Sequence, residues 1–196
     1  MAGVTLHAPP MATRFDDARR YDAVAQALHW LIALAVIGQI ALGLWMIDIP
    51  KLPTGVRAYW FNLHKSIGLT IGLLVVARLA WRLTHRPPAL TALPAWQVRA
   101  AGVTHVLLYA CLVVMPLAGY LGSTFSGYPI RYFGLAVPGW GWKDDALKEL
   151  FSAVHYYTAL VFIALIALHV AAALKHLVVD RDGVFRRMLP ARRQRA

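Results

Sequence analysis

Long apolar stretches dominate the chain, and three of them are long enough to cross a membrane. Residues 23–47, 100–130 and 151–174 contain no Asp, Glu, Lys or Arg. Each stretch exceeds the roughly 18–20 apolar residues that span the hydrocarbon core of a bilayer. A fourth stretch, residues 61–81, is weaker because its uncharged centre covers only residues 66–77. We still expect a helix there, since the basic side chains at its edges are long enough to reach the headgroups.

These stretches predict four transmembrane helices, at about residues 23–47, 61–81, 101–122 and 151–177. The third helix is expected to stop near Gly122, because further glycines and Pro129 follow it. We therefore expect an all-α fold, an integral membrane four-helix bundle over residues 23–178. Residues 1–22 and 179–196 are expected to be polar tails, the second of them strongly basic.

The amino-acid composition supports a membrane protein. Hydrophobic residues make up 59% of the 196 residues and charged residues 15%, whereas a soluble domain has about 45–50% apolar and about 25% charged residues. A soluble core of this size could not bury such an apolar excess. The single cysteine, Cys111, excludes an internal disulfide, a thiolate zinc site and a four-cysteine iron–sulfur cluster.

The basic residues predict the orientation of the bundle. The net charge of +11 would by itself fit a protein that binds nucleic acid or a membrane surface. However, thirteen of the twenty Lys and Arg residues fall in the two tails and the second loop, and only five in the first and third loops. Because cytoplasmic segments carry the excess of basic residues, both termini are expected in the cytoplasm. The charge then requires no nucleic acid, and the basic tail is expected to contact anionic lipid headgroups.

Five histidines fall inside the predicted helices, and this orientation sorts them into two layers. His64 and His155 lie in the outer half of the bundle, and His29, His105 and His169 lie in the inner half. His155 and His169 are 14 residues apart, which places them on similar faces of one helix and about 21 Å apart along its axis. They are too far apart to share one metal ion. An ionisable residue inside a membrane is a functional candidate by default.

Paired histidines in a helix bundle are typical of haem b. A haem takes one imidazole on each side of a flat macrocycle, usually from facing helices, whereas zinc needs closely clustered ligands. The outer layer holds two histidines, so depth alone assigns an outer haem to His64 and His155. The inner layer holds three, so its pair stays open. For any single histidine, a hydrogen bond to a neighbouring helix is the competing interpretation, and a haem-free transporter or structural bundle is the alternative from another class.

Three other residues lie near the two layers. Arg78 follows His64 by 14 residues, so it is expected at the depth of the inner layer, where it either pairs with a haem propionate or extends to the headgroups. Gly43 and Gly119 lie in the outer half of their helices. They would leave room for a porphyrin there or allow close helix packing.

Short motifs around these residues resemble the bacterial cytochrome b561 family, which is related to the di-haem cytochrome b subunits of membrane formate dehydrogenases and hydrogenases. The resemblance covers about residues 20–190, and the five histidines in this order make it specific. The matching segments are Ala27–Trp30, Asn62–Gly68, Ala77–Leu79, His105 with Tyr109, Met115–Gly119, Tyr128–Pro129, Phe133–Leu135, His155, Ala167–Ala173 and Arg187–Pro190.

The resemblance implies two haem b groups in the bacterial inner membrane, each held by two histidines. The outer haem is then held by His64 and His155, and the inner haem by His29 and His169. His105 is left without a haem and would serve a quinone or proton site, or lie near a propionate. In size the chain is similar to a branch of the family that acts as a superoxide oxidase and passes electrons from periplasmic superoxide to ubiquinone.

We therefore expect a di-haem membrane cytochrome that carries electrons between an outer donor and ubiquinone, similar to a superoxide:ubiquinone oxidoreductase. Lys65, Arg131 and Lys143 are the basic side chains expected to attract the superoxide anion to the outer face. The main alternative is a membrane-anchor cytochrome b subunit that exchanges electrons between a periplasmic dehydrogenase or reductase partner and quinone.

Overall fold

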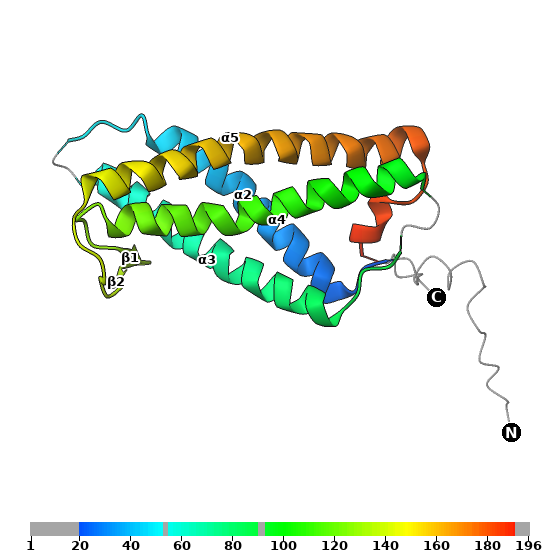
Figure 1. Ribbon diagram of the computed structural model, residues 1–196, viewed down its shortest axis with the longest axis horizontal. Helices are drawn as coiled ribbons and strands as arrows, with labels where there is room; N and C mark the ends of the chain where they lie inside the picture. The colour runs from blue at the N-terminus through cyan, green and yellow to red at the C-terminus, as the bar shows by residue number, and fades with distance from the viewer. Residues whose placement is uncertain (1–19, 53–54, 90–92, 191–196) are drawn as a thin grey trace, which may run out of the picture.

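The computed structural model describes residues 20–52, 55–89 and 93–190. Most of the expected N-terminal tail and the end of the expected C-terminal tail lie outside the described residues. Within the described part, four long helices run lengthwise through the molecule (Figure 1). They are α2 (Ala23–Met46), α3 (Val56–Thr84), α4 (Ala95–Thr124) and α5 (Asp145–Lys175).

All four helices are long and apolar enough to cross a membrane. The most apolar window of each has a mean hydropathy between 1.5 and 2.3, and only 6–11% of that window is buried inside the protein. Large side chains such as Leu34, Leu73 and Leu168 are therefore exposed. Such a surface is unusual for a soluble monomer and fits a surrounding bilayer. The prediction of an all-α fold with four long apolar helices is confirmed.

Three helices begin earlier than the pattern of uncharged residues predicts. α3 begins at Val56 instead of residue 61, α4 at Ala95 instead of 101, and α5 at Asp145 instead of 151. The absence of charge marks only the part of a helix that lies in hydrocarbon, whereas the helices continue into the polar interface. At α5 the extension begins at a side-chain cap, since Asp144 accepts a hydrogen bond from the N–H of Leu147 at 3.0 Å.

A small core occupies the middle of the bundle, where α2 packs along α3 and α4 packs along α5. Its residues lie about midway along their helices, between the outer and the inner histidines, and every helix contributes to it. They are Ile32, Val36, Ile71, Val75, Cys111 and Phe162. The two histidine layers are thus separated by packed apolar side chains.

The two ends of the described chain meet at one end of the bundle. Arg20 donates a hydrogen bond to the carbonyl of Pro190 at 3.1 Å. α5 continues through the π-helix η1 (His176–Asp180) and the 3₁₀ helix η2 (Phe185–Met188), which turns back toward the start of α2 (Figure 1). There the Trp30 indole donates to the Met188 carbonyl at 2.7 Å. We call this end the inner end, in line with the predicted orientation.

A short β-hairpin lies at the opposite, outer end, near the end of α4 and the start of α5 (Figure 1). Its strands β1 (Arg131–Tyr132) and β2 (Leu135–Ala136) are antiparallel. Phe133 and Gly134 both have positive φ values, 47° and 93°, as a tight two-residue hairpin turn requires.

Candidate functional site

The structure brings His64 of α3 and His155 of α5 together in the outer layer. Their ring centres are 6.1 Å apart and the rings are inclined by 72°. The two helices that carry them run along different sides of the bundle, so the imidazoles approach each other across its interior. This is the pair that depth alone had predicted.

The two outer histidines differ in their hydrogen bonds. Nδ1 of His155 is 3.0 Å from the Met115 carbonyl, so Nδ1 carries the proton and donates, and Nε2 keeps a free lone pair. Nδ1 of His64 is buried and has no hydrogen-bond partner among the described residues. The backbone carbonyl of His64 instead accepts a hydrogen bond from Nε2 of Gln39 at 2.6 Å, which ties α3 to α2 at this level.

Two glycines flank these rings. A methyl group at Gly43 would lie 3.2 Å from Cε1 of His64, and a methyl group at Gly119 would lie 3.2 Å from both Cε1 and Nδ1 of His155. Those distances are tighter than ordinary contacts. Both glycines therefore leave the space that lets an imidazole lie close against the neighbouring helix. The sequence had predicted room for a porphyrin or close helix packing at these positions.

The inner layer contains three histidines, and His169 of α5 lies between the other two. Its ring centre is 6.4 Å from that of His29, with an angle of 73°. It is 5.4 Å from that of His105, with an angle of 64°. The structure thus places all three residues in one cluster but at different separations.

These separations test whether the pairs fit an iron ion. An imidazole nitrogen lies about 2 Å from a first-row metal ion and the ring centre roughly 1.1 Å further, so two imidazoles on opposite sides of one ion have centres roughly 6.3 Å apart. The distances of 6.1 Å for His64–His155 and 6.4 Å for His29–His169 fit this value. The 5.4 Å between His105 and His169 is too short for it.

Arg78 lies beside the inner cluster. Its Nε donates to the Tyr109 hydroxyl at 3.0 Å and its Nη1 donates to the Ala25 carbonyl at 2.9 Å. The guanidinium of Arg82 lies 5.7 Å from the centre of the Tyr109 ring. Arg78 and Tyr109 line a cavity of about 20 Å³, which has room for about one water molecule. This cavity is too small for a quinone ring.

The three basic residues predicted to attract an anion have different surroundings. Lys65 follows His64 directly and has no hydrogen bond or ion pair within the described part of the chain. Arg131 lies in β1 and donates to the Gly134 carbonyl at 3.3 Å. Lys143 forms an exposed ion pair with Asp145 at 3.6 Å, so its charge is partly offset.

The outer hairpin is attached to the turn of α3 that follows Lys65. Ser66 is almost fully buried, and its hydroxyl accepts a hydrogen bond from the Phe133 N–H at 2.9 Å. The hydroxyls of Thr70 and Tyr132 are 3.1 Å apart. The hydroxyl of Ser66 also lies 3.2 Å from the Arg131 carbonyl. The sequence gives Ser66 and Thr70 no predicted role of their own, because small hydroxyl residues in an apolar helix form no distinctive pattern.

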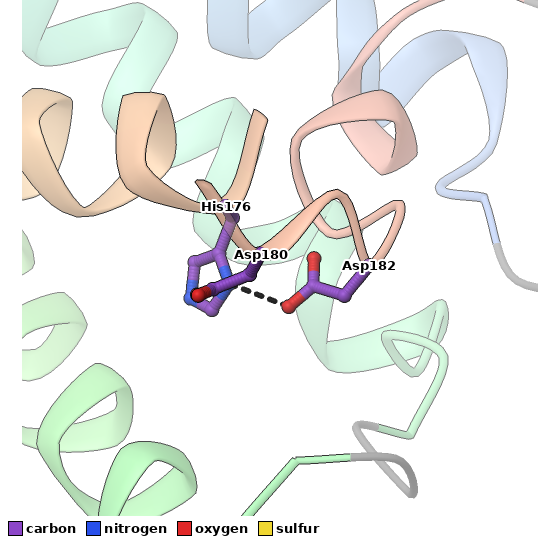
Figure 2. Close-up of side chains that lie close together, drawn as sticks. All are labelled: His176, Asp180 and Asp182. Carbon is purple, nitrogen blue, oxygen red and sulfur yellow. Dashed lines mark hydrogen bonds and ion pairs between the residues drawn. The ribbon is translucent and has the colours of Figure 1, made fainter. Parts of the chain in front are cut away.

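A further cluster lies at the inner end of α5, where His176, Asp180 and Asp182 point toward one another (Figure 2). Nδ1 of His176 is 2.6 Å from Asp182 Oδ2 and 3.2 Å from Asp180 Oδ2. Nζ of Lys175 is 2.5 Å from the same Asp180 oxygen. Although three potential ligand atoms converge here, the Lys175 ammonium already pairs with Asp180 and the His176 ring already contacts Asp182. We interpret the cluster as an ion-pair network that ends α5.

A membrane bundle with facing histidines at two depths has the architecture of a b-type membrane cytochrome. The chain belongs to the prokaryotic cytochrome b561 family, whose family model matches residues 20–191. It is 35% identical over 178 residues to cytochrome b561 homolog 2 of Escherichia coli (strain K12), covering 87% of this chain and 91% of that protein. It is 29% identical over 180 residues to cytochrome b561 homolog 1 of the same organism, covering 89% and 99%.

Family membership confirms the resemblance found in the sequence motifs. The protein is a membrane electron carrier of this family, and the family implies haem b as its cofactor. The four apolar helices and the prokaryotic family together confirm the predicted membrane location.

Proposed function

We propose that the chain binds two haem b groups, one between His64 and His155 and one between His29 and His169, and carries electrons from an outer donor to a quinone in the bilayer. The observation that supports this most is the pair of ring separations, 6.1 and 6.4 Å. Each fits one iron ion, and the packed core lies between the two pairs.

The ring separations also favour His29 over His105 as the partner of His169. At 5.4 Å from His169, the His105 ring is too close for an iron ion between them, so His105 acts in the inner layer without being a ligand. We assign His105 to a haem propionate or to proton transfer at a quinone, and Arg78 to a propionate. Haem supplies a one-electron couple, and two imidazoles leave no open coordination position, which favours electron transfer without oxygen binding.

We propose superoxide as the donor because two basic residues, Lys65 and Arg131, lie next to the part of α3 that carries His64. Lys65 is the next residue along α3, and the backbone of Arg131 lies against Ser66. A positive surface raises the local concentration of an anion. Two superoxide ions would each lose one electron and become dioxygen, and one quinone would take up the two electrons and two protons to form a quinol.

Haem content and a reduced-minus-oxidised visible spectrum of the purified protein test the assignment. We expect two haems per chain in the parent protein and one in each of His64→Ala and His29→Ala, because each variant removes one ligand from one layer. His105→Ala is the matched control, since it removes an imidazole from the inner layer that we do not assign as a ligand, and it should keep two haems. A parent protein with one haem, or a His29→Ala variant with two, would contradict the proposal.

A further inference from the structure

His155 differs from the other four membrane histidines in one respect. Within the residues that the structure describes, it alone has a hydrogen-bond partner for a ring nitrogen, the Met115 carbonyl at 3.0 Å from Nδ1. The corresponding atom of His64 is buried without a partner there. The two ligands that we assign to the outer haem are therefore chemically unequal.

Gly119 explains how the His155 ring reaches this carbonyl. Gly119 lies four residues after Met115, on the same face of α4 and one turn further along. A methyl group at this position would lie 3.2 Å from both Nδ1 and Cε1 of His155, so any larger residue would push the ring away. The next residue after Met115 is Pro116, whose ring nitrogen forms the amide of the Met115 carbonyl. Because Pro116 has no N–H, the carbonyl of Leu112, one turn earlier, loses its helical donor.

We propose that Gly119 is a positioning residue that lets the Met115 carbonyl accept a hydrogen bond from His155 and thereby lowers the reduction potential of the outer haem. The inference rests on the proposed function, in which His155 is a ligand of that haem. A carbonyl that accepts from the Nδ1–H of an imidazole makes the other ring nitrogen a more basic ligand. A more basic ligand stabilises oxidised iron relative to reduced iron, which is one way in which proteins set a haem potential.

The direction of this effect matters for electron flow. The inner histidines His29, His105 and His169 have no such acceptor among the described residues. The hydrogen bond therefore lowers the potential of the outer haem alone, and it favours transfer of an electron from the outer haem to the inner one.

Gly43 provides a matched control for Gly119. A methyl group at Gly43 would crowd Cε1 of His64 at the same distance, 3.2 Å, but His64 has no hydrogen bond to lose. Gly43→Ala and Gly119→Ala thus add the same atom beside the two ligands of one haem. Only Gly119→Ala also disturbs the hydrogen bond to Met115.

The test is a potentiometric titration of the purified holoprotein, followed by visible and EPR spectroscopy. The inner haem is identified as the one that remains in His155→Ala. We expect Gly119→Ala to raise the midpoint potential of the outer haem by about 59 mV, which corresponds to a tenfold change in a one-electron reduction equilibrium. The ferric EPR signal of that haem should shift as well. The inner haem, and both haems of Gly43→Ala, should keep their potentials.

Equal shifts in Gly119→Ala and Gly43→Ala would show that crowding alone acts, and an unshifted Gly119→Ala would also overturn the inference. If Gly119→Ala does not accumulate, Pro116→Ala serves instead. It adds no atom beside His155, but it turns the Met115 carbonyl from a tertiary into a secondary amide carbonyl, which accepts a hydrogen bond less strongly. It should therefore shift the outer potential in the same direction. An unshifted Pro116→Ala would overturn the inference. If His155→Ala keeps both haems, the proposed function itself is wrong, so the two failures can be distinguished.

Discussion

The outer and inner histidine layers contain the same kind of residue but are built differently. The outer layer has two imidazoles, each beside a glycine, with one ring nitrogen bound to a backbone carbonyl. The inner layer has three imidazoles, next to a guanidinium that is bound to a tyrosine hydroxyl and a carbonyl. The outer layer therefore offers one pairing only, whereas the inner layer has one imidazole to spare for other chemistry.

The surroundings of the two layers also differ. At the outer end, a hairpin is fastened to α3 by Ser66 and Thr70, close to the basic residue Lys65. At the inner end, the segment that precedes the bundle in the sequence is hydrogen-bonded to the segment that follows it. Tyr21 donates its N–H to the Arg187 carbonyl at 3.1 Å. The outer end is thus closed by a hairpin that is attached to α3, whereas the inner end is closed by the two ends of the described chain.

The largest expected effect is the loss of the inner haem, and comparing two variants distinguishes the two candidate partners of His169. Replacing His169 with Phe should remove the inner haem completely, because it removes the imidazole that lies beside both other histidines of that layer. His105→Phe keeps the His29–His169 pair and should keep two haems, with a changed rate of quinone reduction. Haem quantification per chain measures the first effect, and stopped-flow reduction of a ubiquinone analogue measures the second. Loss of the inner haem in His105→Phe would show that His105 is a ligand.

The next effect concerns the charge of the outer end. Removing two positive charges in Lys65→Gln/Arg131→Gln should slow the oxidation of superoxide about 10-fold at low ionic strength, and the difference should shrink as salt is added. Lys148→Gln, which removes one charge elsewhere at the outer end, is the control for total charge and should change the rate less. Stopped-flow kinetics with superoxide measure both. A rate that does not respond to the double substitution would contradict steering by these residues.

A smaller effect is expected from the polar contacts of the inner layer. Arg78→Gln removes the hydrogen bonds that a charged donor makes to Tyr109 and Ala25, and it should lower the free energy of unfolding by about 2–3 kcal/mol. Tyr109→Phe removes only one of these partners and should lower the free energy of unfolding by about 1 kcal/mol. Unfolding of the detergent-solubilised protein, followed by circular dichroism, compares the two. If Tyr109→Phe destabilised the protein as much as Arg78→Gln, the Ala25 contact would contribute nothing.

The smallest effect compares the helix caps at the two ends. Desolvation works to raise the pKa of Asp22, but hydrogen bonds from the Ala25 N–H and the Trp81 indole outweigh it and hold the pKa below 3.8. The stability that ionised Asp22 contributes is therefore complete above the pKa of the unfolded chain, near 3.8, and is lost as the pH falls through the lower pKa of the folded state. At neutral pH, Asp22→Ala should cost about 1 kcal/mol.

Asp144→Ala is the matched variant for this comparison, because Asp144 caps α5 at the outer end with a hydrogen bond to Leu147 but none to a tryptophan. Unfolding midpoints measured at neutral pH and below pH 3.8 check both caps. Asp22→Ala should remove part of the acid sensitivity that the parent protein shows. An unchanged pH dependence in Asp22→Ala would show that its carboxylate does not contribute.

Much of the site could be predicted from the sequence because depth in a membrane is a one-dimensional property. The separation of His155 and His169 along the sequence, multiplied by the helical rise per residue, gives the distance between the two layers without any knowledge of packing. The pair His64–His155 then follows from counting. The choice between His29 and His105 could not be made from the residues themselves, because both lie at the same depth. Which of the two rings faces His169 at a suitable distance depends on how each helix is rotated about its axis.

The sequence by itself determined the membrane location, the four helices and the two depths at which histidines lie, because apolar length and helical rise are local properties of a segment. Only the tertiary structure decided that Gly119 brings His155 to the Met115 carbonyl, that Ser66 holds the hairpin, and that His29 lies farther from His169 than His105 does. These are contacts between elements that lie far apart in the sequence. They depend on how each helix is rotated and placed against its neighbours, which no single segment encodes.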